Sequence, residues 1–458
     1  MQISKLKVEG GVMKKNAKNN LGYIIYLGIL LVIGYFFFFC LGEQGYILEK
    51  DSGVFLDKKL SYQYIVYPQF LGVCRKIFGE KYYLEWVSNI QGVISLCVSL
   101  ITTEYFRKNY KLNYIWGGLM FICTFAPYAY SLPQYVSSHS IMTEGLAFPL
   151  FYLWMLFILQ IYLKRQNGWF LPLFFVTLIM AYTRTQLMLF FIVCFVMVVE
   201  RFGTYIYHKF KERNRKLFIR IGILIGVICF FTGIKIFLVF IQNNIYPQMT
   251  DAVAGRIFCA AEESDVGLFE GRNKDLFSAI YTEIEQEESR QIYFRTGIRQ
   301  WEDIVNATNE NTKILGWIIR PYYEEIETAR LNDVKGHLAY TMMLEHWDDY
   351  LSMTANLMLQ SFVVSIFIHP ESAYVWGYII AILMYVLGIA SIIGGRKKYC
   401  LENEYIFPLV ITLLVITSIC VITNVLFMGL QRYVVYPFGF FYISLMLIYI
   451  GVRRIKAK

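Results

Sequence analysis

The sequence predicts an all-α membrane protein that crosses the bilayer about ten times. Of its 458 residues, 57% are hydrophobic and only 17% are charged, a balance beyond that of ordinary soluble domains. Apolar runs of about 20 residues, the length that spans a bilayer, recur from one end of the chain to the other. Lysine and arginine gather in short clusters beside these runs, which is typical of cytoplasmic loops.

Ten segments have the length and apolar character of transmembrane helices. The first is too long and too aromatic for the core of a cleaved signal peptide, and no small-residue cleavage site follows it, so we interpret it as a retained anchor. In chain order the segments are residues 21–41, 86–103, 113–132, 146–163, 169–183, 185–200, 221–241, 373–394, 405–427 and 433–451.

The basic clusters predict the orientation of these spans. They lie at alternate ends, and the positive-inside rule places all of them, together with both termini, in the cytoplasm. The acidic residues agree, because all but six of the 34 Asp and Glu then fall on the outer side. We therefore expect a multi-pass protein of the plasma or inner cell membrane. The clusters are Lys5–Lys18, Arg107–Lys111, Lys164–Arg165, Arg201–Arg220, Arg396–Lys398 and Arg453–Lys458.

Two further apolar stretches, residues 60–79 and 351–370, would each reverse the orientation of the downstream chain if they crossed the membrane. We interpret both as helices in the outer interface, with apolar residues at helical spacing. Residues 242–372 are then the only sizeable soluble part, a mostly helical extracytoplasmic insertion. It separates an N-terminal membrane module, residues 1–241, from a C-terminal one, residues 373–458.

Charge and cysteine patterns exclude several functions. The net charge of +9 comes from dispersed clusters that follow the topology, and no nucleic-acid-binding module is recognisable, so we expect membrane lipids and no nucleic acid as partners. Most of the nine cysteines lie inside apolar runs without metal-ligand spacing. Cys74 and Cys259 are predicted on the outer side, and we expect no disulfide between them. The sequence has no Gly-rich phosphate loop and no GxSxG.

Charged residues gather at the predicted outer ends of several spans. Charges so close to hydrocarbon are costly, and those that face protein or a water-filled cavity tend to mark function. The alternative for each is an interfacial charge whose side chain reaches water. The candidates are Glu49 and Asp51 after the first span, Glu144 before the fourth, Arg184 between the fifth and sixth, and Arg432 before the tenth.

Two of these charges are expected below the membrane surface. The fifth span has about 14 residues before Thr183 and Arg184, so at 1.5 Å per residue it covers about 21 Å of a core about 30 Å thick. Arg184 should therefore lie in a recess. Glu144 is followed directly by a glycine and apolar sequence, which favours a similar depth.

Four short motifs around these charges resemble the GT-C superfamily of polytopic membrane glycosyltransferases. Members of this superfamily take a sugar from a polyprenyl phosphate carrier on the outer face of the membrane. The resemblance covers roughly residues 20–200 and 425–450, and it implies a GT-C-like fold that transfers a lipid-linked sugar, with inversion, to a glycan, lipid or protein acceptor. The motifs are EKDS at 49–52, TEGLAFP at 143–149, YTRTQ at 182–186 and QRYVVYP at 431–437.

The acidic residues suit this transfer, because a base must take a proton from the acceptor hydroxyl group. We predict Asp51 as the general base, with Glu144 or Glu49 orienting the acceptor. Carboxylates near the anomeric carbon also stabilise an oxocarbenium-like transition state. Glu49 and Asp51 could alternatively bind a divalent cation, Mg²⁺ or Mn²⁺. Metal dependence stays open, because EKD stands where many relatives have Asp-x-Asp or Asp-Glu.

Transfer also needs positive charge to hold the phosphate that leaves. Arg184 and Arg432, with the adjacent Tyr433, would hold it, because a guanidinium makes paired charge-assisted hydrogen bonds to phosphate. His139 has two interpretations. It would either hold these residues in place without contacting the substrate or be a solvated loop histidine, and we favour the solvated histidine. The stretch EHWDDYL, residues 345–351, has donors for a metal but no recognised spacing, so we expect a polar helix end there.

Two other functions stay open. A polysaccharide polymerase also combines many spans with a large outer loop, and a lipid or solute transporter such as a flippase is a different class altogether. Transport is less favoured, because no inverted repeat or matched pair of Gly/Pro-broken spans is visible and ionisable residues gather at one face. The insertion precedes the eighth span, whereas many GT-C relatives have their soluble part after the last span, so no role is transferred to it.

Overall fold

The computed structural model describes residues 21–43, 45–49, 51–56, 66–188, 190–191, 193–194, 196–197, 200, 246–286, 300–322, 328–367, 374–426 and 431–457. Within these ranges the chain has helices, no strand and two isolated β-bridges, so the all-α prediction is confirmed for them. The chain divides into two compact units. The first is Met1–Arg184 with Phe438–Met446, and the second is Thr185–Pro437 with Leu447–Lys458.

Six of the described helices are long and apolar enough to cross a membrane. Two shorter apolar helical segments, Tyr114–Tyr128 and Phe170–Thr183, match the third and fifth predicted spans. These helices support the prediction of a membrane protein. The count of ten spans stays a prediction, because residues 221–241 lie outside the described ranges and residues 185–200 are only partly described. The six are Leu21–Cys40, Val66–Asn109, Glu144–Leu163, Trp376–Lys397, Asn403–Val425 and Phe438–Lys456.

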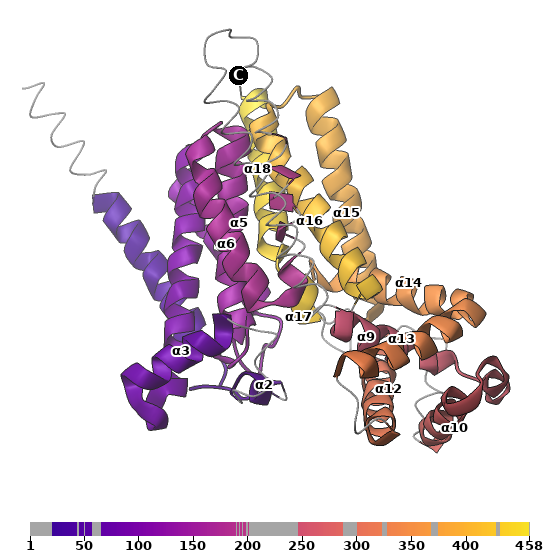
Figure 1. The fold of residues 1–458 in the computed structure, drawn as a ribbon. Helices are drawn as coiled ribbons and strands as arrows, with labels where there is room; N and C mark the ends of the chain where they lie inside the picture. The colour runs from indigo at the N-terminus through magenta and orange to yellow at the C-terminus, as the bar shows by residue number, and fades with distance from the viewer. Residues whose placement is uncertain are drawn as a thin grey trace, which may run out of the picture. The chain divides into compact units, whose positions relative to one another are not determined.

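The first unit is built from apolar helices and contains the two loops that the predicted spans place on the outer side (Figure 1). The first outer loop is residues 42–85, and the second outer loop is Ser131–Gly145. After the first helix, Leu21–Cys40, whose last turn is η1 (Phe36–Cys40), its elements are α2 (Ser52–Leu56), α3 (Val66–Asn109), α4 (Tyr114–Cys123), η3 (Ala126–Tyr128), η4 (Ser137–His139), α5 (Glu144–Leu163), η5 (Asn167–Trp169) and α6 (Phe170–Thr183).

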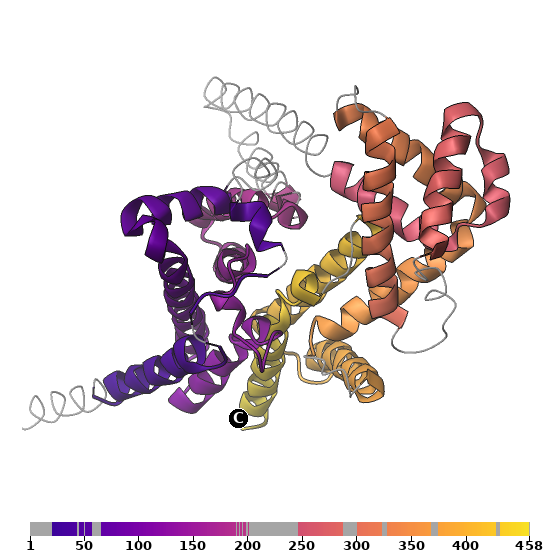
Figure 2. The ribbon, with the colours of Figure 1, turned by 90° about the horizontal axis from the view of Figure 1, so that it is seen from below.

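Helix α3 covers residues 66–79 of the first predicted interfacial helix, whose residues 60–65 lie outside the described ranges, and all of the predicted second span. They meet at Gly79, whose φ of 76° and ψ of 163° are not helical and suit a residue without Cβ. The arms before and after Gly79 run in different directions (Figures 1 and 2). The first arm buries Tyr67, Leu71 and Cys74 in a core shared with the loop before α5, and it leaves Val73 and Ile77 exposed. One apolar face is therefore packed on protein and the other is open.

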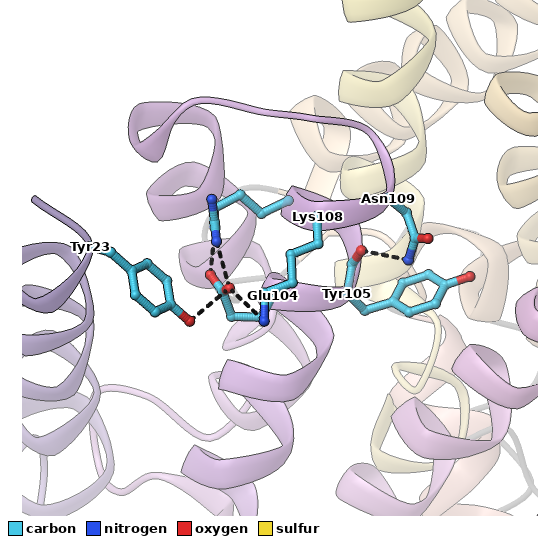
Figure 3. Close-up of polar contacts among 6 residues, drawn as sticks. Tyr23, Glu104, Tyr105, Lys108 and Asn109 are labelled. Atoms are coloured by element: carbon cyan, nitrogen blue, oxygen red, sulfur yellow. Dashed lines mark hydrogen bonds and ion pairs between the residues drawn. The ribbon is translucent and has the colours of Figure 1, made fainter. Parts of the chain in front are cut away.

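At its far end α3 carries a compact polar cluster (Figure 3). Glu104 accepts hydrogen bonds from Nε and Nη2 of Arg107, at 2.6 and 2.8 Å, and from the hydroxyl of Tyr23 on the first helix, at 3.1 Å. Lys108 Nζ lies 3.7 Å from the same carboxylate. Glu104 is one of the six acidic residues on the predicted inner side, and these cationic neighbours compensate its charge within a basic cluster.

Helices α5 and α6 form an antiparallel hairpin, because only six residues separate Leu163 from Phe170 (Figure 1). Buried Trp154 donates from Nε1 to Thr177 Oγ1 at 3.1 Å and so links the two helices inside the apolar core. The hairpin brings the beginning of α5 and the end of α6 to the same end of the unit.

The second unit contains the described part of the insertion and the later membrane helices. The described part of the insertion is helical, as predicted, and its helices share a core that includes Phe258, Phe277 and Leu338. The elements are η6 (Thr185–Met188), α9 (Tyr246–Ile257), η8 (Phe258–Ala260), η9 (Glu263–Leu268), α10 (Gly271–Gln286), α12 (Gln300–Tyr322), α13 (Thr328–Glu345), α14 (Trp347–Val364), α15 (Tyr374–Lys397), α16 (Asn403–Leu426) and α17 (Gln431–Val434), and α18 (Phe438–Lys456) continues from the first unit.

Helix α14 corresponds to the second predicted interfacial helix, and it runs across the ends of α15 and α16 (Figure 1). Buried Arg256 of α9 fixes this arrangement, because its Nη1 donates to Thr354 Oγ1 at 3.0 Å and to the Asn424 carbonyl oxygen at 2.6 Å. Burial lowers the pKa of the Arg256 guanidinium, and its interactions with Tyr350 and Cys259 oppose that shift.

The stretch 345–351 is a polar helix junction, as predicted. His346 lies between the end of α13 and the beginning of α14, and its Nε2 lies 2.9 Å from Oδ2 of Asp265. The same Asp265 oxygen accepts the backbone N–H of Glu262 at 2.6 Å. His346 therefore ties this junction to η9.

The predicted beginning of the tenth span, residue 433, is wrong. Residues 431–434 form the separate short helix α17, and the long helix α18 begins at Phe438. Pro437 explains the break, because it has no N–H to donate and disfavours helical geometry at the residue before it. Arg432 and Tyr433 consequently lie outside the spanning helix.

Candidate functional site

A buried ion pair joins two of the predicted site residues. Nη1 of Arg184 lies 2.6 Å from Oε1 of Glu144, and the two side chains are 5% and 0% exposed. Thr143 donates from Oγ1 to the other carboxylate oxygen of Glu144 at 3.0 Å. Arg184 thus lies within protein in contact with an acid, and its side chain does not extend to water.

The ends of the hairpin helices explain why these charges are tolerated there. Glu144 is the first residue of α5, and Arg184 directly follows the last residue of α6, where its N–H donates to the Met180 carbonyl oxygen at 2.9 Å. Negative charge is stabilised at a helix N-terminus and positive charge at a C-terminus. Each charge therefore complements its own helix as well as its partner.

Glu49 is held by hydroxyl groups of the second outer loop. Its Oε1 accepts hydrogen bonds from the Tyr135 hydroxyl at 2.8 Å and from Ser140 Oγ at 2.7 Å. Buried Ser52 closes the turn after it, since Ser52 Oγ accepts the Glu49 N–H at 2.9 Å and the Ser52 N–H donates to the Glu49 carbonyl oxygen at 3.0 Å. Half-buried Asp51 lies in this turn, directly before α2.

Backbone pairing fixes the two outer loops against each other. Isolated β-bridges join Gly42 to Tyr135 and Ile47 to Ser140. The N–H of Ile47 donates to the His139 carbonyl oxygen, and the N–H of Ile141 donates to the Ile47 carbonyl oxygen, both at 2.9 Å. The carboxylate of Glu49 therefore extends from a segment whose position depends on the second loop.

His139 is buried, so the interpretation as a solvated loop histidine is wrong. Its Nδ1 lies 3.1 Å from the Glu43 carbonyl oxygen, and its Nε2 lies 2.6 Å from that of Phe38. Both partners belong to the end of the first helix or the loop after it. His139 therefore supports the loop that carries Glu49 and Asp51, although its polar sequence neighbours favoured solvent.

Tyr67 of α3 connects the two parts of the candidate site. Its buried hydroxyl donates to Oε1 of Gln91 at 2.8 Å. Gln91 in turn donates to the carbonyl oxygen of Ser140, whose Oγ donates to Glu49, and it lies against Gly145, the residue after Glu144. The first unit thus brings Glu49, Glu144 and Arg184 around one region, with Asp51 on the adjoining turn. Their catalytic and binding roles stay predictions.

Arg432 and Tyr433 belong to the second unit. The Arg432 guanidinium lies 5.3 Å from the centre of the Tyr433 ring, and its Nη2 lies 3.5 Å from the Tyr433 hydroxyl oxygen. The two residues therefore form one local group on α17. That Arg432 and Arg184 hold the same phosphate stays a prediction.

The described residues contain no group of three or more His, Cys, Asp or Glu side chains that could hold a metal ion. Oε1 of Glu49 accepts two hydroxyl donors, which occupy the lone pairs that a cation would use. A metal role for Glu49 would thus depend on other atoms. Cys74 and Cys259 are free and buried, and burial raises the pKa of the Cys259 thiol to about 12.

The sequence interpretation missed the polar residues around the acids. Tyr135 and Ser140 hydrogen-bond Glu49, and Tyr67 donates to Gln91 beside them. Gln91 had a signal, because a polar residue inside a predicted span is expected to have a protein partner. Comparisons with protein-family models, curated proteins and solved structures found no match to the chain. The GT-C resemblance therefore depends on the four motifs alone.

Proposed function

We propose that the protein is a membrane glycosyltransferase that moves a sugar from a polyprenyl phosphate carrier to an acceptor on the outer face, with inversion. The observation that carries this proposal is the buried Glu144–Arg184 pair beside the loop that holds Glu49 and Asp51. Acid and guanidinium groups are the two chemical types that the transfer needs, and they lie at the ends of apolar helices where a lipid-linked donor would be reached.

The arrangement supports a division of roles. A guanidinium has five N–H donors in a fixed plane, so Arg184 can contact Glu144 and a phosphate at once, and Glu144 would orient that contact. Asp51 is half-buried on a turn that Ser52 fixes, so it can accept a proton from an entering hydroxyl group. Glu49 keeps the second loop in place and lies beside the acceptor.

The test uses the purified full-length protein in nanodiscs with a panel of polyprenyl phosphate sugars and an acceptor extract. We expect one donor to be consumed, with release of polyprenyl phosphate and a new glycosidic bond of inverted configuration. The proposal fails if the protein consumes none of the donors.

The same preparation separates the alternative functions. A polymerase would join lipid-linked oligosaccharides into longer chains, and a flippase would move the lipid-linked sugar between leaflets of a vesicle without any bond change. The clustering of acids and an arginine in the first unit favours bond transfer over transport, because a transport site is expected near the bilayer midplane.

A further inference from the structure

Gln91 is a buried polar hub in the second arm of α3. Its Nε2 donates to the carbonyl oxygens of Ser138 and Ser140, at 2.9 and 3.0 Å, and its Oε1 accepts the Tyr67 hydroxyl at 2.8 Å. The side chain is 0% exposed. Both N–H donors of the amide are therefore used on one short segment, residues 138–140, which they fix against α3.

That segment holds the first-loop acid. Ser140 uses its carbonyl oxygen for Gln91 and its Oγ for Glu49, at 2.7 Å. The neighbouring backbone bonds through Ile47 pair the same segment with the chain just before Glu49. A displacement of the Gln91 amide would thus reach Glu49 through a single intervening residue.

The Gln91 amide also lies against Gly145, the residue after Glu144. A Cβ atom built on Gly145 would lie 2.4 Å from Cδ, 2.5 Å from Nε2 and 2.8 Å from Oε1 of Gln91. Gly145 belongs to α5, where alanine would otherwise favour the helix by about 1 kcal/mol. The glycine of the TEG sequence therefore makes room for the Gln91 amide.

We infer that Gln91 is a positioning residue whose hydrogen bonds determine where Glu49 lies relative to the buried Glu144–Arg184 pair. The absence of a side chain at Gly145 leaves room for the Gln91 amide. The inference rests on the proposed function, because the groups that Gln91 positions are taken to be the acids of a glycosyl transfer site. It assigns to Gly145 a steric role, because a side chain at this position would meet the Gln91 amide. Because Gln91 is fully buried, we expect it to contact neither the sugar donor nor the sugar acceptor and to act through Ser138 and Ser140.

A double-mutant cycle tests this inference, because Gly145→Ala and Gln91→Ala should not act independently. The atoms nearest to the Cβ added by Gly145→Ala belong to the flexible end of Gln91, so the protein should fold, but the amide must leave the two carbonyl oxygens. We expect kcat to fall about tenfold, as the loss of one or two hydrogen bonds implies, with the KM for the donor unchanged.

Gln91→Ala should give the same loss of kcat. Adding Gly145→Ala to Gln91→Ala should then lower kcat no further and should raise the unfolding temperature, since the steric conflict is gone and alanine favours the helix. Additive losses of kcat in the double variant would overturn the inference. Thr102→Val is the matched control, a buried polar residue further along α3, and it should leave kcat unchanged.

Hydrogen–deuterium exchange gives a readout that does not need activity. Gly145→Ala and Gln91→Ala should both speed exchange in residues 43–49 and 134–141, and Thr102→Val should not. If the wild-type protein consumes no donor, the proposed function fails, and the exchange data alone decide whether Gln91 fixes the Glu49 loop. Unchanged exchange in both variants would overturn the inference even in an active enzyme.

Discussion

Two acid–arginine pairs in the first unit are built in different ways. Glu104 and Arg107 are three residues apart on α3, are 14% and 16% exposed, and share their contacts with Lys108 and Tyr23. Glu144 and Arg184 are 40 positions apart, are buried at 0% and 5%, and meet only because a hairpin brings two helix ends together. The first pair is a local product of helix spacing, whereas the second depends on the tertiary fold.

This difference in burial and in sequence separation indicates which pair has a function beyond stability. The cluster of Glu104 lies within a basic segment of the predicted cytoplasmic side and joins helices, so packing explains it fully. A deeply buried pair gains little net stability over apolar residues of similar volume. Glu144 and Arg184 are therefore poorly explained by stability alone, and a chemical role accounts better for them.

Loss of Arg184 should give the largest effect. Arg184→Ala leaves the buried charge of Glu144 without its arginine partner, and breaking such a pair costs about 3–5 kcal/mol. The combined Arg184→Met and Glu144→Leu variant removes both charges at similar volume and should recover much of that stability. Thermal unfolding of the purified protein measures both. Equal destabilisation of the single and combined variants would show that the buried charge is not the cause.

Replacement of arginine by lysine should lower turnover at the Glu144–Arg184 pair and leave it unchanged at the Glu104–Arg107 pair. Arg184→Lys keeps the charge but loses the planar donor geometry, and we expect turnover to fall about 100-fold, in the range seen when one donor to a developing anion is removed. Arg107→Lys is the matched control and should leave turnover unchanged. Normal turnover of Arg184→Lys would argue that the pair is structural, like that of Glu104.

The smallest effect is expected at the local pair. Arg107→Ala removes a partly exposed ion pair and contacts with the rings of Tyr23 and Tyr114, which should lower the free energy of unfolding by about 1–2 kcal/mol. Turnover should be unaffected, because the cluster lies at the opposite end of α3 from Tyr67. A large loss of turnover with normal stability would remove the contrast between the pairs.

Much of the fold follows from sequence pattern. Apolar length predicts the described spanning helices, because a bilayer demands about 20 apolar residues whatever their partners. The break before α18 also had a local signal in Pro437, as the kink in α3 had in Gly79. The charge of Glu104 on the predicted inner side is explained by neighbours three and four residues away.

The candidate site could be predicted only in part. Glu144 and Arg184 stand out as charges beside apolar sequence, but their direct contact depends on how α5 and α6 pack, which hydropathy does not encode. His139 was misjudged because its neighbours are polar, although the fold buries it. The hydrogen bonds of Gln91 form only when three segments of the chain come together. A polar residue in a predicted span therefore indicates that it has a partner but does not identify that partner.

The most direct test of the central claim, that the first-loop acids beside the Glu144–Arg184 pair are catalytic, is the turnover of Asp51→Asn. This change keeps the size of the side chain but removes its basicity, so turnover should fall at least about 100-fold, within the range of general-base catalysis, while the unfolding temperature stays that of the wild type. Glu43→Gln, an exposed acid of the same loop, should leave turnover unchanged. Should Asp51→Asn stay active while Glu144→Gln is inactive, the base is Glu144. Full activity of both variants would contradict the claim.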